Sequence, residues 1–325
     1  MSGTKPRVFV TRRLPQPALD RLEQHAEVVV NPEDRVLTRE ELLEGVHWCD
    51  ALLPLLTDLI DARVMDENAG LRIIANCAVG YNNVNVAAAT VRGIPVTNTP
   101  GVLTETTADL AWSLMMATAR RIVEADNFLR NGQFEGWAPM MLLGLDIYGK
   151  TLGIIGMGQI GRAMARRALG FLMRTLYYDA APVQVEEWLQ ATPVDMETLL
   201  RESDFVTVHV PLTPETQHLI DETALGKMKD TAILINTSRG PVVDEAALVK
   251  ALQEGVIAGA GLDVFEREPA LAEGLAELDN VVIVPHIGSA SVETRTKMAL
   301  LAADNIIARI TGQPLLTCVN PEVLS

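Results

Sequence analysis

The segment 152–179 reads LGIIGMGQIGRAMARRALGFLMRTLYYD, and its pattern decides the fold. Residues 152–155 form a short apolar strand that runs into a glycine turn spanning 156–161. A helical pattern follows, then a second apolar strand at 175–178 and the acid Asp179. Strand, glycine turn, helix, strand and acid in this order are typical of a βαβ unit that binds a dinucleotide.

Each glycine of this turn would have a physical role in such a unit. Gly156 permits the tight turn, Gly158 lets the backbone approach a pyrophosphate, and Gly161 lets the helix pack on the strand. The helix N-terminus offers unpaired N–H groups and the positive end of its dipole to that phosphate. An ordinary βα turn without a ligand is the weaker alternative. The residues expected to contact the cofactor here are Gly156, Met157, Gly158, Gln159, Ile160 and Gly161.

Asp179 stands 18 residues after Gly161 (161 to 179), at the end of the second strand. A carboxylate at this place can accept hydrogen bonds from both hydroxyls of the adenine-side ribose, and it would repel a 2′-phosphate. We therefore expect NAD(H) to be preferred, with NADP(H) as the alternative cofactor. A solvated acid at a strand end is the competing interpretation of this residue.

The composition narrows the class of protein. The chain has 325 residues, enough for about two domains, with 48% apolar and 21% charged residues, as in ordinary globular proteins. A net charge of −15 argues against nucleic acid or an anionic membrane as the main partner. Three cysteines without metal-type spacing predict reduced thiols and no metal site. No signal-type or membrane-length apolar run is evident, so a cytoplasmic location is expected.

Strands and helices alternate along the whole chain, which predicts α/β sheets. In the first hundred residues we expect strands at 7–11, 26–30, 51–55, 71–75 and 94–97. Residues 104–129 are predicted to form one long apolar-striped helix leading into the second domain. Beyond it we expect strands at 152–155, 175–178, 205–210, 232–235, 258–264 and 281–284. Their near-continuous apolar runs indicate a parallel sheet buried on both faces. A helix is expected at 291–310, returning the chain to the first domain.

Three chemically suited side chains follow three of these strands. Arg239 comes after 232–235, Glu268 after 258–264, and His286 after 281–284. Because ligands bind at the carboxyl ends of parallel strands, we expect the three to meet at the edge that carries the glycine turn.

The three types suit hydride transfer to a 2-oxo acid. Arg239 can bind the carboxylate through two parallel N–H donors, and His286 can give a proton to the carbonyl oxygen. Glu268 would fix the tautomer of His286 and stabilise its protonated ring. Taken singly, each residue has a structural alternative, such as a surface ion pair for Arg239 or a turn for Glu268. A metal site at His286 is not expected, because no second histidine or cysteine lies nearby in the sequence. His209, inside a strand, is interpreted as a core or edge residue only.

Several further segments match a known family. They are Ala78-Val79-Gly80-Tyr81-Asn82-Asn83, Val96-Thr97-Asn98-Thr99-Pro100, Thr107-Ala108-Asp109-Leu110-Ala111, Val210-Pro211-Leu212-Thr213, Asn236-Thr237-Ser238-Arg239-Gly240, Gly261-Leu262-Asp263-Val264-Phe265-Glu266 and Pro285-His286-Ile287-Gly288-Ser289. With these and the glycine turn, the chain resembles the D-isomer-specific 2-hydroxyacid dehydrogenases over nearly its full length. Within that family it is most similar to glyoxylate/hydroxypyruvate reductases.

The resemblance implies two Rossmann-like doubly wound parallel-sheet domains, one flavodoxin-like and one dinucleotide-binding, with an interdomain cleft. Residues 1–100 with 291–325 would form a discontinuous substrate-binding domain, and 101–290 the dinucleotide-binding domain. The implied activity is NAD(P)H-dependent reduction of glyoxylate, hydroxypyruvate or a similar small 2-oxo acid to the D-2-hydroxy acid. A homodimer, formed through the helix at 104–129, is also implied.

The resemblance also assigns roles to residues of this chain. Arg239 would bind substrate, with Glu268 and His286 as the acid/base pair. The substrate contacts implied are Leu55, Val79, Gly80, Arg239 and His286, with the backbone of Val79 and Gly80 holding the carboxylate. Thr107, Thr237 and Asp263 would lie near the nicotinamide, and Val210 and Pro211 near the adenine-side ribose. The remaining cofactor contacts implied are Tyr178, Ser238 and Gly288.

The chain departs from the pattern of that family at a few positions, and other functions stay open. Asn82 stands where relatives often have an acid, and Met141 where many reductases place a tryptophan, with Trp137 four residues earlier. Phosphite dehydrogenase is an alternative, although Ala78 and Val79 stand where it has a lysine. Phosphoglycerate dehydrogenase is another, without room for an appended regulatory domain. A co-repressor-like NAD-sensing binding protein is the alternative from outside the enzymes; the short chain ends weigh against it.

Overall fold

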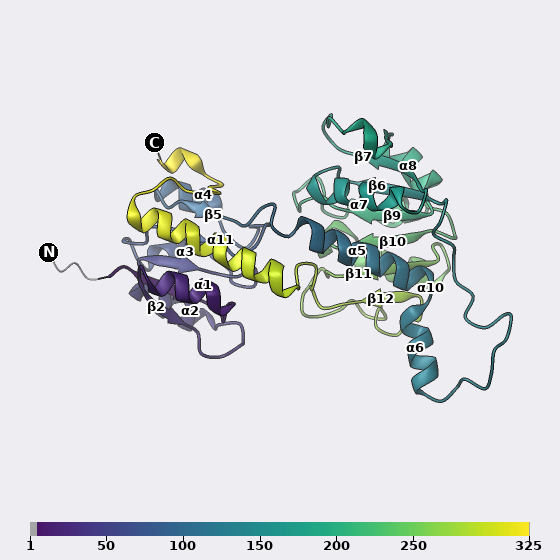
Figure 1. The fold of residues 1–325 in the computed structure, drawn as a ribbon, viewed down its shortest axis with the longest axis horizontal. Coiled ribbons are helices and arrows are strands. Elements are labelled where there is room, and N and C mark those ends of the chain that lie inside the picture. The colour runs from purple at the N-terminus through teal and green to yellow at the C-terminus, as the bar shows by residue number, and fades with distance from the viewer. Residues whose placement is uncertain (1–4, 325) are drawn as a thin grey trace. The chain divides into compact units, whose positions relative to one another are not determined.

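The computed structural model describes residues 5–324, and the chain forms two compact units. Met1–Leu103 together with Ala290–Ser325 make up the first unit, and Thr104–Ser289 make up the second. Both are α/β units built on parallel sheets, as the alternating pattern predicts (Figure 1). The separate roles predicted for the two domains remain predictions.

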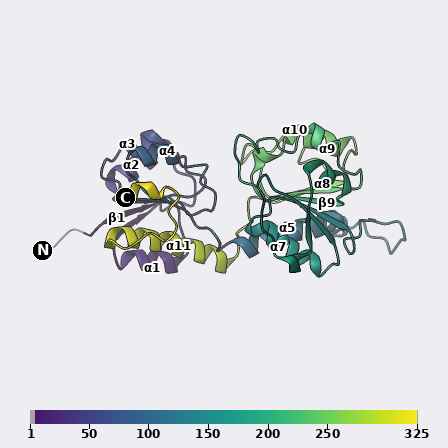
Figure 2. The same cartoon turned by 90° about the horizontal axis from the view of Figure 1, so that it is seen from above.

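The first unit contains a five-stranded sheet with the order β2-β1-β3-β4-β5. Its strands are β1 (Arg7–Val10), β2 (Glu27–Val30), β3 (Ala51–Leu53), β4 (Ile74–Ala75) and β5 (Val96–Thr97). Its longer helices are α1 (Gln16–Glu23), α2 (Arg39–Trp48), α3 (Ala62–Asp66), α4 (Val86–Val91) and α11 (Val292–Thr311). Helices α2, α3 and α4 cover one face of the sheet, and α1 and α11 cover the other (Figure 2).

The second unit contains a seven-stranded parallel sheet with the order β12-β11-β10-β9-β6-β7-β8. Its strands are β6 (Thr151–Ile155), β7 (Arg174–Tyr178), β8 (Ala191–Pro193), β9 (Phe205–Val208), β10 (Ile233–Asn236), β11 (Gly259–Leu262) and β12 (Val281–Ile283). Helices α5 (Thr104–Ala119) and α7 (Gln159–Leu169) lie on one face, while α8 (Met196–Glu202), α9 (Glu222–Leu225) and α10 (Glu245–Gln253) lie on the other (Figure 2). The chain winds outward from β6 in both directions, so the glycine turn after β6 lies at the switch point where such sheets bind ligands.

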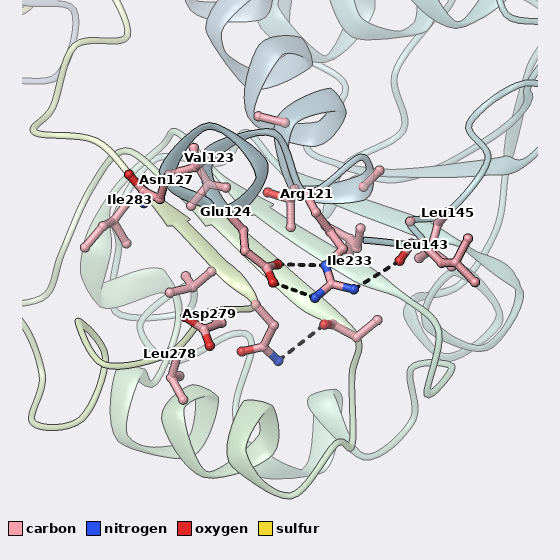
Figure 3. Close-up of a pocket in the computed structure, with 18 of the residues that line it drawn as sticks. Arg121, Val123, Glu124, Asn127, Leu143, Leu145, Ile233, Leu278, Asp279 and Ile283 are labelled. Carbon is pink, nitrogen blue, oxygen red and sulfur yellow. Dashed lines mark hydrogen bonds and ion pairs between the residues drawn. The ribbon is translucent and has the colours of Figure 1, made fainter. Parts of the chain in front are cut away.

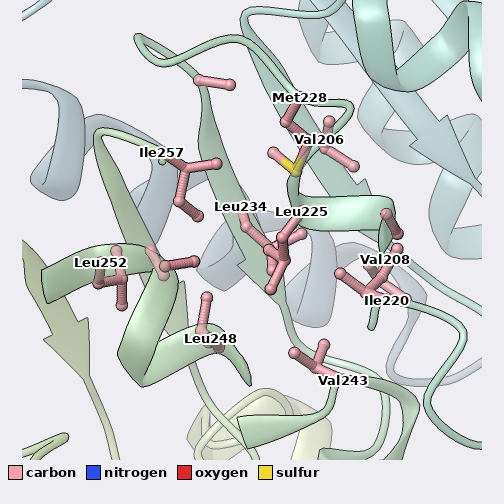
Figure 4. Close-up of a cluster of buried hydrophobic side chains, with 14 of the residues drawn as sticks. Val206, Val208, Ile220, Leu225, Met228, Leu234, Val243, Leu248, Leu252 and Ile257 are labelled. Carbon is pink, nitrogen blue, oxygen red and sulfur yellow. The ribbon is translucent and has the colours of Figure 1, made fainter. Parts of the chain in front are cut away.

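A large apolar cluster fixes α9 and α10 on this sheet (Figure 4). Val206 and Leu234 on neighbouring strands are fully buried, and Leu225, Leu248 and Leu252 from the two helices cover them. The other face of the strands is also buried, against α5 and α7. This double burial explains the near-continuous apolar runs and confirms the predicted parallel sheet.

The single helix predicted for 104–129 is wrong, because the chain forms two helices there. α5 ends at Ala119, and α6 (Ile122–Arg130) begins after Arg121, whose φ of 52° is left-handed. The carbonyl of Ala119 accepts a hydrogen bond from the N–H of Leu145 at 2.8 Å, in place of the next helical N–H. A contact from a segment 26 residues further on (119 to 145) therefore ends the helix, and helical periodicity cannot reveal it.

The predicted strand bounds also need correction. Strand β8 at the sheet edge was not predicted, since it is short, largely exposed and ends in a proline. The strands predicted at 71–75 and 258–264 are shorter in the structure, as β4 and β11. Leu71, Ile73 and Val264 are buried in the loops next to these strands, which explains why the apolar pattern is longer than the strands.

Candidate functional site

The glycine turn has the geometry that its sequence predicts. Gly156 has a left-handed φ of 94°, and a Cβ there would lie 2.7 Å from the carbonyl oxygen of His209. A Cβ on Gly161 would lie 2.2 Å from the carbonyl oxygen of Gly156, so helix α7 packs directly on the turn. A Cβ on Gly158, in contrast, would meet no atom of residues 5–324 within 4 Å. Gly158 is the N-cap of α7 without a side-chain cap, so this helix end is open and fits a pyrophosphate.

Asp179 lies beside this turn. Its Oδ2 accepts a hydrogen bond from the N–H of Met157 at 2.9 Å, and its Oδ1 accepts from the N–H of Ala181 at 3.3 Å. The carboxylate is therefore held next to the space that a dinucleotide on this turn would occupy. No positively charged side chain directly follows it, because Ala180 and Ala181 come next.

Arg239, Glu268 and His286 follow three neighbouring strands, β10, β11 and β12, at their carboxyl ends. Nδ1 of His286 lies 2.9 Å from Oε2 and 3.2 Å from Oε1 of Glu268. The charge of Glu268 also acts on Arg239, whose Nη1 donates to the carbonyl of Ser238 at 2.6 Å. The three side chains thus follow strands at one edge of the sheet, with Glu268 hydrogen-bonded to His286.

The electrostatics of the three side chains are linked. Burial lowers the pKa of Arg239, and the nearby charge of Glu268 partly offsets this. Burial by itself would raise the pKa of Glu268, but the hydrogen bond and charge of His286 outweigh it and the net pKa is lowered. Glu268 is therefore ionised and accepts the Nδ1 proton of His286, which leaves Nε2 to face a ligand. Across residues 5–324, no acidic side chain lies within 4 Å of the Arg239 guanidinium as an ion-pair partner.

Asp263 fixes the loop that carries His286. This nearly fully buried carboxylate accepts hydrogen bonds from the N–H groups of Ile287 at 2.6 Å and Gly288 at 2.8 Å. The N–H of His286 donates to the backbone carbonyl of Asp263 at 2.9 Å. Burial raises the pKa of Asp263 to about 6, against the lowering effect of these N–H groups and of His286.

Glu245 and Glu266 fix the loop that carries Glu268, and the sequence reasoning missed both. The N–H of Glu266 donates to Oε1 of Glu245 at 2.5 Å, and the N–H of Glu245 donates to Oε1 of Glu266 at 2.8 Å. Glu245 is 5% exposed, at the start of α10. Gly240 allows the same close approach, since a Cβ there would lie 1.9 Å from the carbonyl carbon of Phe265. Hydrogen bonds between residues 21 positions apart leave no local pattern in the sequence. The only sequence indication was that Glu266 lies in a segment that matches the family.

The other predicted cofactor residues of this unit lie around the same strand ends. Thr107 at the start of α5 is buried, and its side chain lies close to Gly288. Thr237 follows β10, and its Oγ1 is buried with no partner among the residues that the structure describes. Val210 lies against Gly156, and the remaining residues follow or end strands here, namely Tyr178, Pro211 and Ser238. His209 is half-buried and lies directly after β9, not inside a strand, and its Nε2 is 2.8 Å from Oγ1 of Thr207.

The predicted substrate contacts of the first unit lie at the carboxyl ends of its own strands. Leu55 follows β3, and its N–H donates to Oδ2 of Asp58 at 2.8 Å. Val79 and Gly80 follow β4, and both of their carbonyl oxygens accept hydrogen bonds from asparagine side chains.

A pocket of about 600 Å³ lies elsewhere in the second unit (Figure 3). Thr231, Ala258 and Asn280, which precede β10, β11 and β12, line it together with the corner between α5 and α6. The ion pair of Arg121 and Glu124 at 2.7 Å is among its walls. None of the predicted site residues lines this pocket, and it opens at the amino ends of the strands, so it is not the candidate active site.

The described part of the chain has neither a metal-binding cluster nor a membrane-length helix. Between residues 5 and 324 no group of three His, Cys, Asp or Glu side chains could hold a metal ion. In the same range no helix is long and apolar enough to cross a membrane. Cys49 and Cys77 are buried free thiols, and burial raises the pKa of each to about 12. The cytoplasmic location remains a prediction.

Comparison with known proteins shows the family of this chain. Residues 112–288 match the model of the D-isomer-specific 2-hydroxyacid dehydrogenase NAD-binding domain. The glyoxylate reductase of Korarchaeum cryptofilum is 55% identical over 323 residues, covering 98% of this chain and 97% of that protein. The glyoxylate reductase of Thermococcus gammatolerans is 55% identical over 325 residues, with coverage of 98% and 97%.

Solved structures show the same relationship. A protein of Thermus thermophilus has a TM-score of 0.92 and 48% identity, over 96% of this chain and 99% of that one. The NADPH-dependent glyoxylate/hydroxypyruvate reductase of Sinorhizobium meliloti, in complex with NADP and malonate, has a TM-score of 0.86 and 37% identity, over 97% of both chains. The chain therefore belongs to the D-isomer-specific 2-hydroxyacid dehydrogenase family. It is an oxidoreductase that uses a nicotinamide dinucleotide, and the resemblance stated from the sequence is confirmed.

Proposed function

We propose that this enzyme reduces glyoxylate, hydroxypyruvate or a similar small 2-oxo acid to the D-2-hydroxy acid, with NADH as the preferred cofactor. One observation carries the proposal: Glu268 holds Nδ1 of His286 at 2.9 Å while its charge acts on Arg239, in a unit with a dinucleotide-type glycine turn. The glyoxylate reductases among its relatives, 55% identical, support the choice of substrate class.

Arg239 is proposed to bind the substrate carboxylate. Its guanidinium is half-buried, and no ion-pair partner lies within 4 Å of it in the part of the chain that the structure describes. A half-buried cation in this state is stabilised by an anion, and a carboxylate matches the two parallel donors of a guanidinium. Leu55, Val79 and Gly80 are the further substrate contacts that we propose from the family resemblance.

His286 is proposed to supply the proton. When NADH is bound it supplies the hydride for the carbonyl carbon, and the carbonyl oxygen then needs one proton. Because Glu268 accepts the Nδ1 proton, the imidazolium of His286 donates from Nε2 and becomes a neutral ring. Glu268 stabilises the imidazolium before the transfer and keeps the ring in the orientation that presents Nε2. The 2-oxo acid, NADH and one proton together give the 2-hydroxy acid and NAD⁺.

The preference for NADH is proposed from Asp179. Its carboxylate is held beside the glycine turn by the N–H of Met157 at 2.9 Å. Ribose hydroxyls can donate to such a carboxylate, whereas a 2′-phosphate would be repelled by it. The relative from Sinorhizobium meliloti is NADPH-dependent, so the preference for NADH is proposed from Asp179 and not from that relative.

Purified protein tested against a panel of 2-oxo acids, with NADH and NADPH separately, checks this function. We expect consumption of NADH with glyoxylate and hydroxypyruvate, and a lower kcat/KM with NADPH. Phosphite and 3-phosphoglycerate, each supplied with NAD, test the two alternative enzymes in the same assay. Reduction of NAD by phosphite without any reduction of 2-oxo acids would overturn the proposal.

We also propose that the enzyme is a homodimer formed through α6 and the segment that follows it. No residue of α6 is buried, and large apolar side chains are exposed from there to residue 148. They include Trp137 at 81%, Met140 at 76%, Tyr148 at 65%, Leu129 at 61%, Leu143 at 55% and Ile122 at 55%. An exposed apolar set of this size favours a partner surface, and a second copy of the chain carries the same complementary features.

Light scattering after gel filtration tests the dimer. The wild type should have twice the chain mass of 35.3 kDa. Trp137→Asp should shift the protein toward the monomer, because a charge in an apolar interface is costly. Val91→Asp, at an 87% exposed position of α4, is the matched control and should leave the mass unchanged. A monomeric wild type at micromolar concentration would overturn the dimer.

A further inference from the structure

We propose that Asn98 and Asn76 are positioning residues that orient the backbone of Val79 and Gly80, so that its N–H groups serve as donors to the substrate carboxylate. The inference rests on the proposed function and deepens it. It explains the asparagine in the segment Val96-Thr97-Asn98-Thr99-Pro100, which matches the family but has no role in the chemistry described above.

Three successive carbonyl groups in this loop are held from one set of donors. Nδ2 of Asn98 donates to the carbonyl of Val79 at 2.8 Å, and Nδ2 of Asn76 donates to the carbonyl of Gly80 at 3.0 Å. The carbonyl before them, of Ala78, accepts the N–H of Thr99 at 2.9 Å. All three peptide planes are thereby fixed.

Fixing these carbonyls also fixes the N–H groups of the same peptides. In a planar trans peptide the carbonyl and the N–H of the next residue point in opposite directions. The bond to Ala78 therefore orients the N–H of Val79, and the bond from Asn98 orients the N–H of Gly80. Among the described residues neither N–H has a hydrogen-bond acceptor, although both residues are only part-buried. Adjacent unpaired N–H groups form a concave donor set that suits an anion.

The two asparagines are themselves held firmly. Asn98 exchanges bonds with Thr317: its N–H donates to the Thr317 carbonyl at 3.3 Å, and its carbonyl accepts from Oγ1 of Thr317 at 2.6 Å. The buried Asn305 of α11 in turn donates to Oγ1 of Thr317 at 3.0 Å. The carbonyl of Val79 is thus supported by a chain of hydrogen bonds that runs through Asn98 and Thr317 to Asn305.

Asn76 is supported from the other side. It is 1% exposed and exchanges side-chain hydrogen bonds with Asn83 at 3.2 and 3.1 Å. Nδ2 of Asn83 also donates to the carbonyl of Leu55 at 3.0 Å. The loops after β3 and β4, which carry all three proposed substrate contacts of this unit, are therefore tied together by amide groups.

Substitution of Asn98 tests the inference. Asn98→Asp keeps the shape of the side chain but replaces the amide donor with a carboxylate, which repels the carbonyl oxygen of Val79. Asn98→Ala removes the donor and leaves only a small change in side-chain volume. Both should raise KM for glyoxylate and the Kd of oxamate, an unreactive 2-oxo acid isostere, by roughly tenfold or more, as for loss of a hydrogen bond to a charged group. KM for NADH should stay unchanged, and kcat should change by less than about threefold, because the proton and hydride chemistry is untouched.

Asn320→Ala is the matched control. Asn320 is a buried asparagine of the same unit that accepts from the N–H of Val96 at 2.8 Å and donates to the carbonyl of Ile94 at 3.0 Å; within residues 5–324 no hydrogen bond joins its side chain to the loop of Val79. It should lower the Tm and leave the Kd of oxamate unchanged.

The outcomes separate the two proposals. Wild-type oxamate binding in folded Asn98→Asp and Asn98→Ala overturns the inference even when the wild type reduces glyoxylate. A rise in Kd that Asn320→Ala reproduces for the same fall in Tm also overturns it, since the effect is then a general loss of structure. A wild type that neither binds oxamate nor reduces any 2-oxo acid refutes the proposed function, and this inference with it.

Discussion

His286 and Glu268 face each other from the ends of two neighbouring strands, with Nδ1 2.9 Å from Oε2. The histidine side chain is 27% exposed and the glutamate side chain 33%, so solvent and a small ligand can reach the pair. A ring held at one nitrogen presents the other in a fixed direction, which is the condition for a directed proton transfer.

His286→Ala should lower kcat by about 10²- to 10⁴-fold, the usual contribution of a positioned acid. NADH binding, measured by fluorescence titration, should remain intact, because His286 is not part of the glycine turn. His47→Ala, at a side chain that is 74% exposed, is the control and should retain wild-type kinetics. Full activity of His286→Ala would refute the proposed proton donor.

Arg239→Ala should lower kcat/KM for glyoxylate by about a hundredfold or more, chiefly through KM, because a substrate carboxylate would lose its partner. Arg239→Lys should recover part of this loss, since lysine restores the charge without the two parallel donors. Arg267→Ala, at an exposed arginine near Glu268, should have little effect. Steady-state kinetics of the three variants decide the matter; unchanged kinetics in Arg239→Ala would refute the carboxylate-binding role.

Asp179→Ser and Asp179→Arg should improve the use of NADPH relative to NADH. The first removes the negative charge next to the 2′-position, and the second adds a cation that can pair with the phosphate. The ratio of kcat/KM for the two cofactors should rise by roughly tenfold or more in the arginine variant, as for one new charge-assisted contact. An unchanged ratio would contradict the ribose role of Asp179.

Gly158→Ala and Gly161→Ala should separate cofactor binding from stability. A Cβ on Gly158 would meet no atom of the described residues within 4 Å, so Tm should be unchanged. The Kd for NADH should rise, because the methyl group would lie where a pyrophosphate is expected to approach. A Cβ on Gly161 would be 2.2 Å from the carbonyl of Gly156, so Tm should fall. Calorimetry and NADH titration of both variants give the comparison. Equal losses of Tm in the two variants would show that a methyl group at Gly158 cannot be accommodated without disturbing the fold.

Asp263 should make stability depend on pH. Its pKa is raised to about 6 in the folded protein, from an ordinary value of 3.8, mainly by burial. Between these values the folded state holds a proton that the unfolded state has released, so stability falls as pH rises from about 4 to about 6. Asp263→Asn lacks this titration. Urea midpoints at pH 4, 5, 6 and 7 should therefore show the wild type losing stability relative to the variant as pH rises; a constant difference would contradict the shift.

The local parts of the fold and site were open to prediction from sequence. The glycine turn and Asp179 form a contiguous pattern whose geometry is set by neighbours in the chain. Arg239, Glu268 and His286 follow three neighbouring strands as predicted, because parallel strands bring their carboxyl ends to one edge and strand assignment alone places the residues that follow.

The parts that depend on distant contacts were not. The helix break after Ala119 coincides with the hydrogen bond from the N–H of Leu145, and the carbonyl of Val79 accepts from Asn98, which is bonded in turn to Thr317. These bonds connect residues whose separation in the chain carries no periodic signal. Edge strand β8 was missed for a different reason, since an exposed strand of three residues has almost no apolar pattern.

The exchange of backbone bonds between Glu245 and Glu266 has a consequence for the evolution of specificity. Glu245 begins the helix that follows Arg239, and Glu266 lies two residues before Glu268, so the proposed anion receptor and the partner of the proton donor share one rigid support. A substitution that displaces either loop disturbs both functions at once. Adaptation to larger or smaller acids would therefore be less constrained at the side chain of Leu55, whose substitution leaves the bonds between Glu245 and Glu266 untouched.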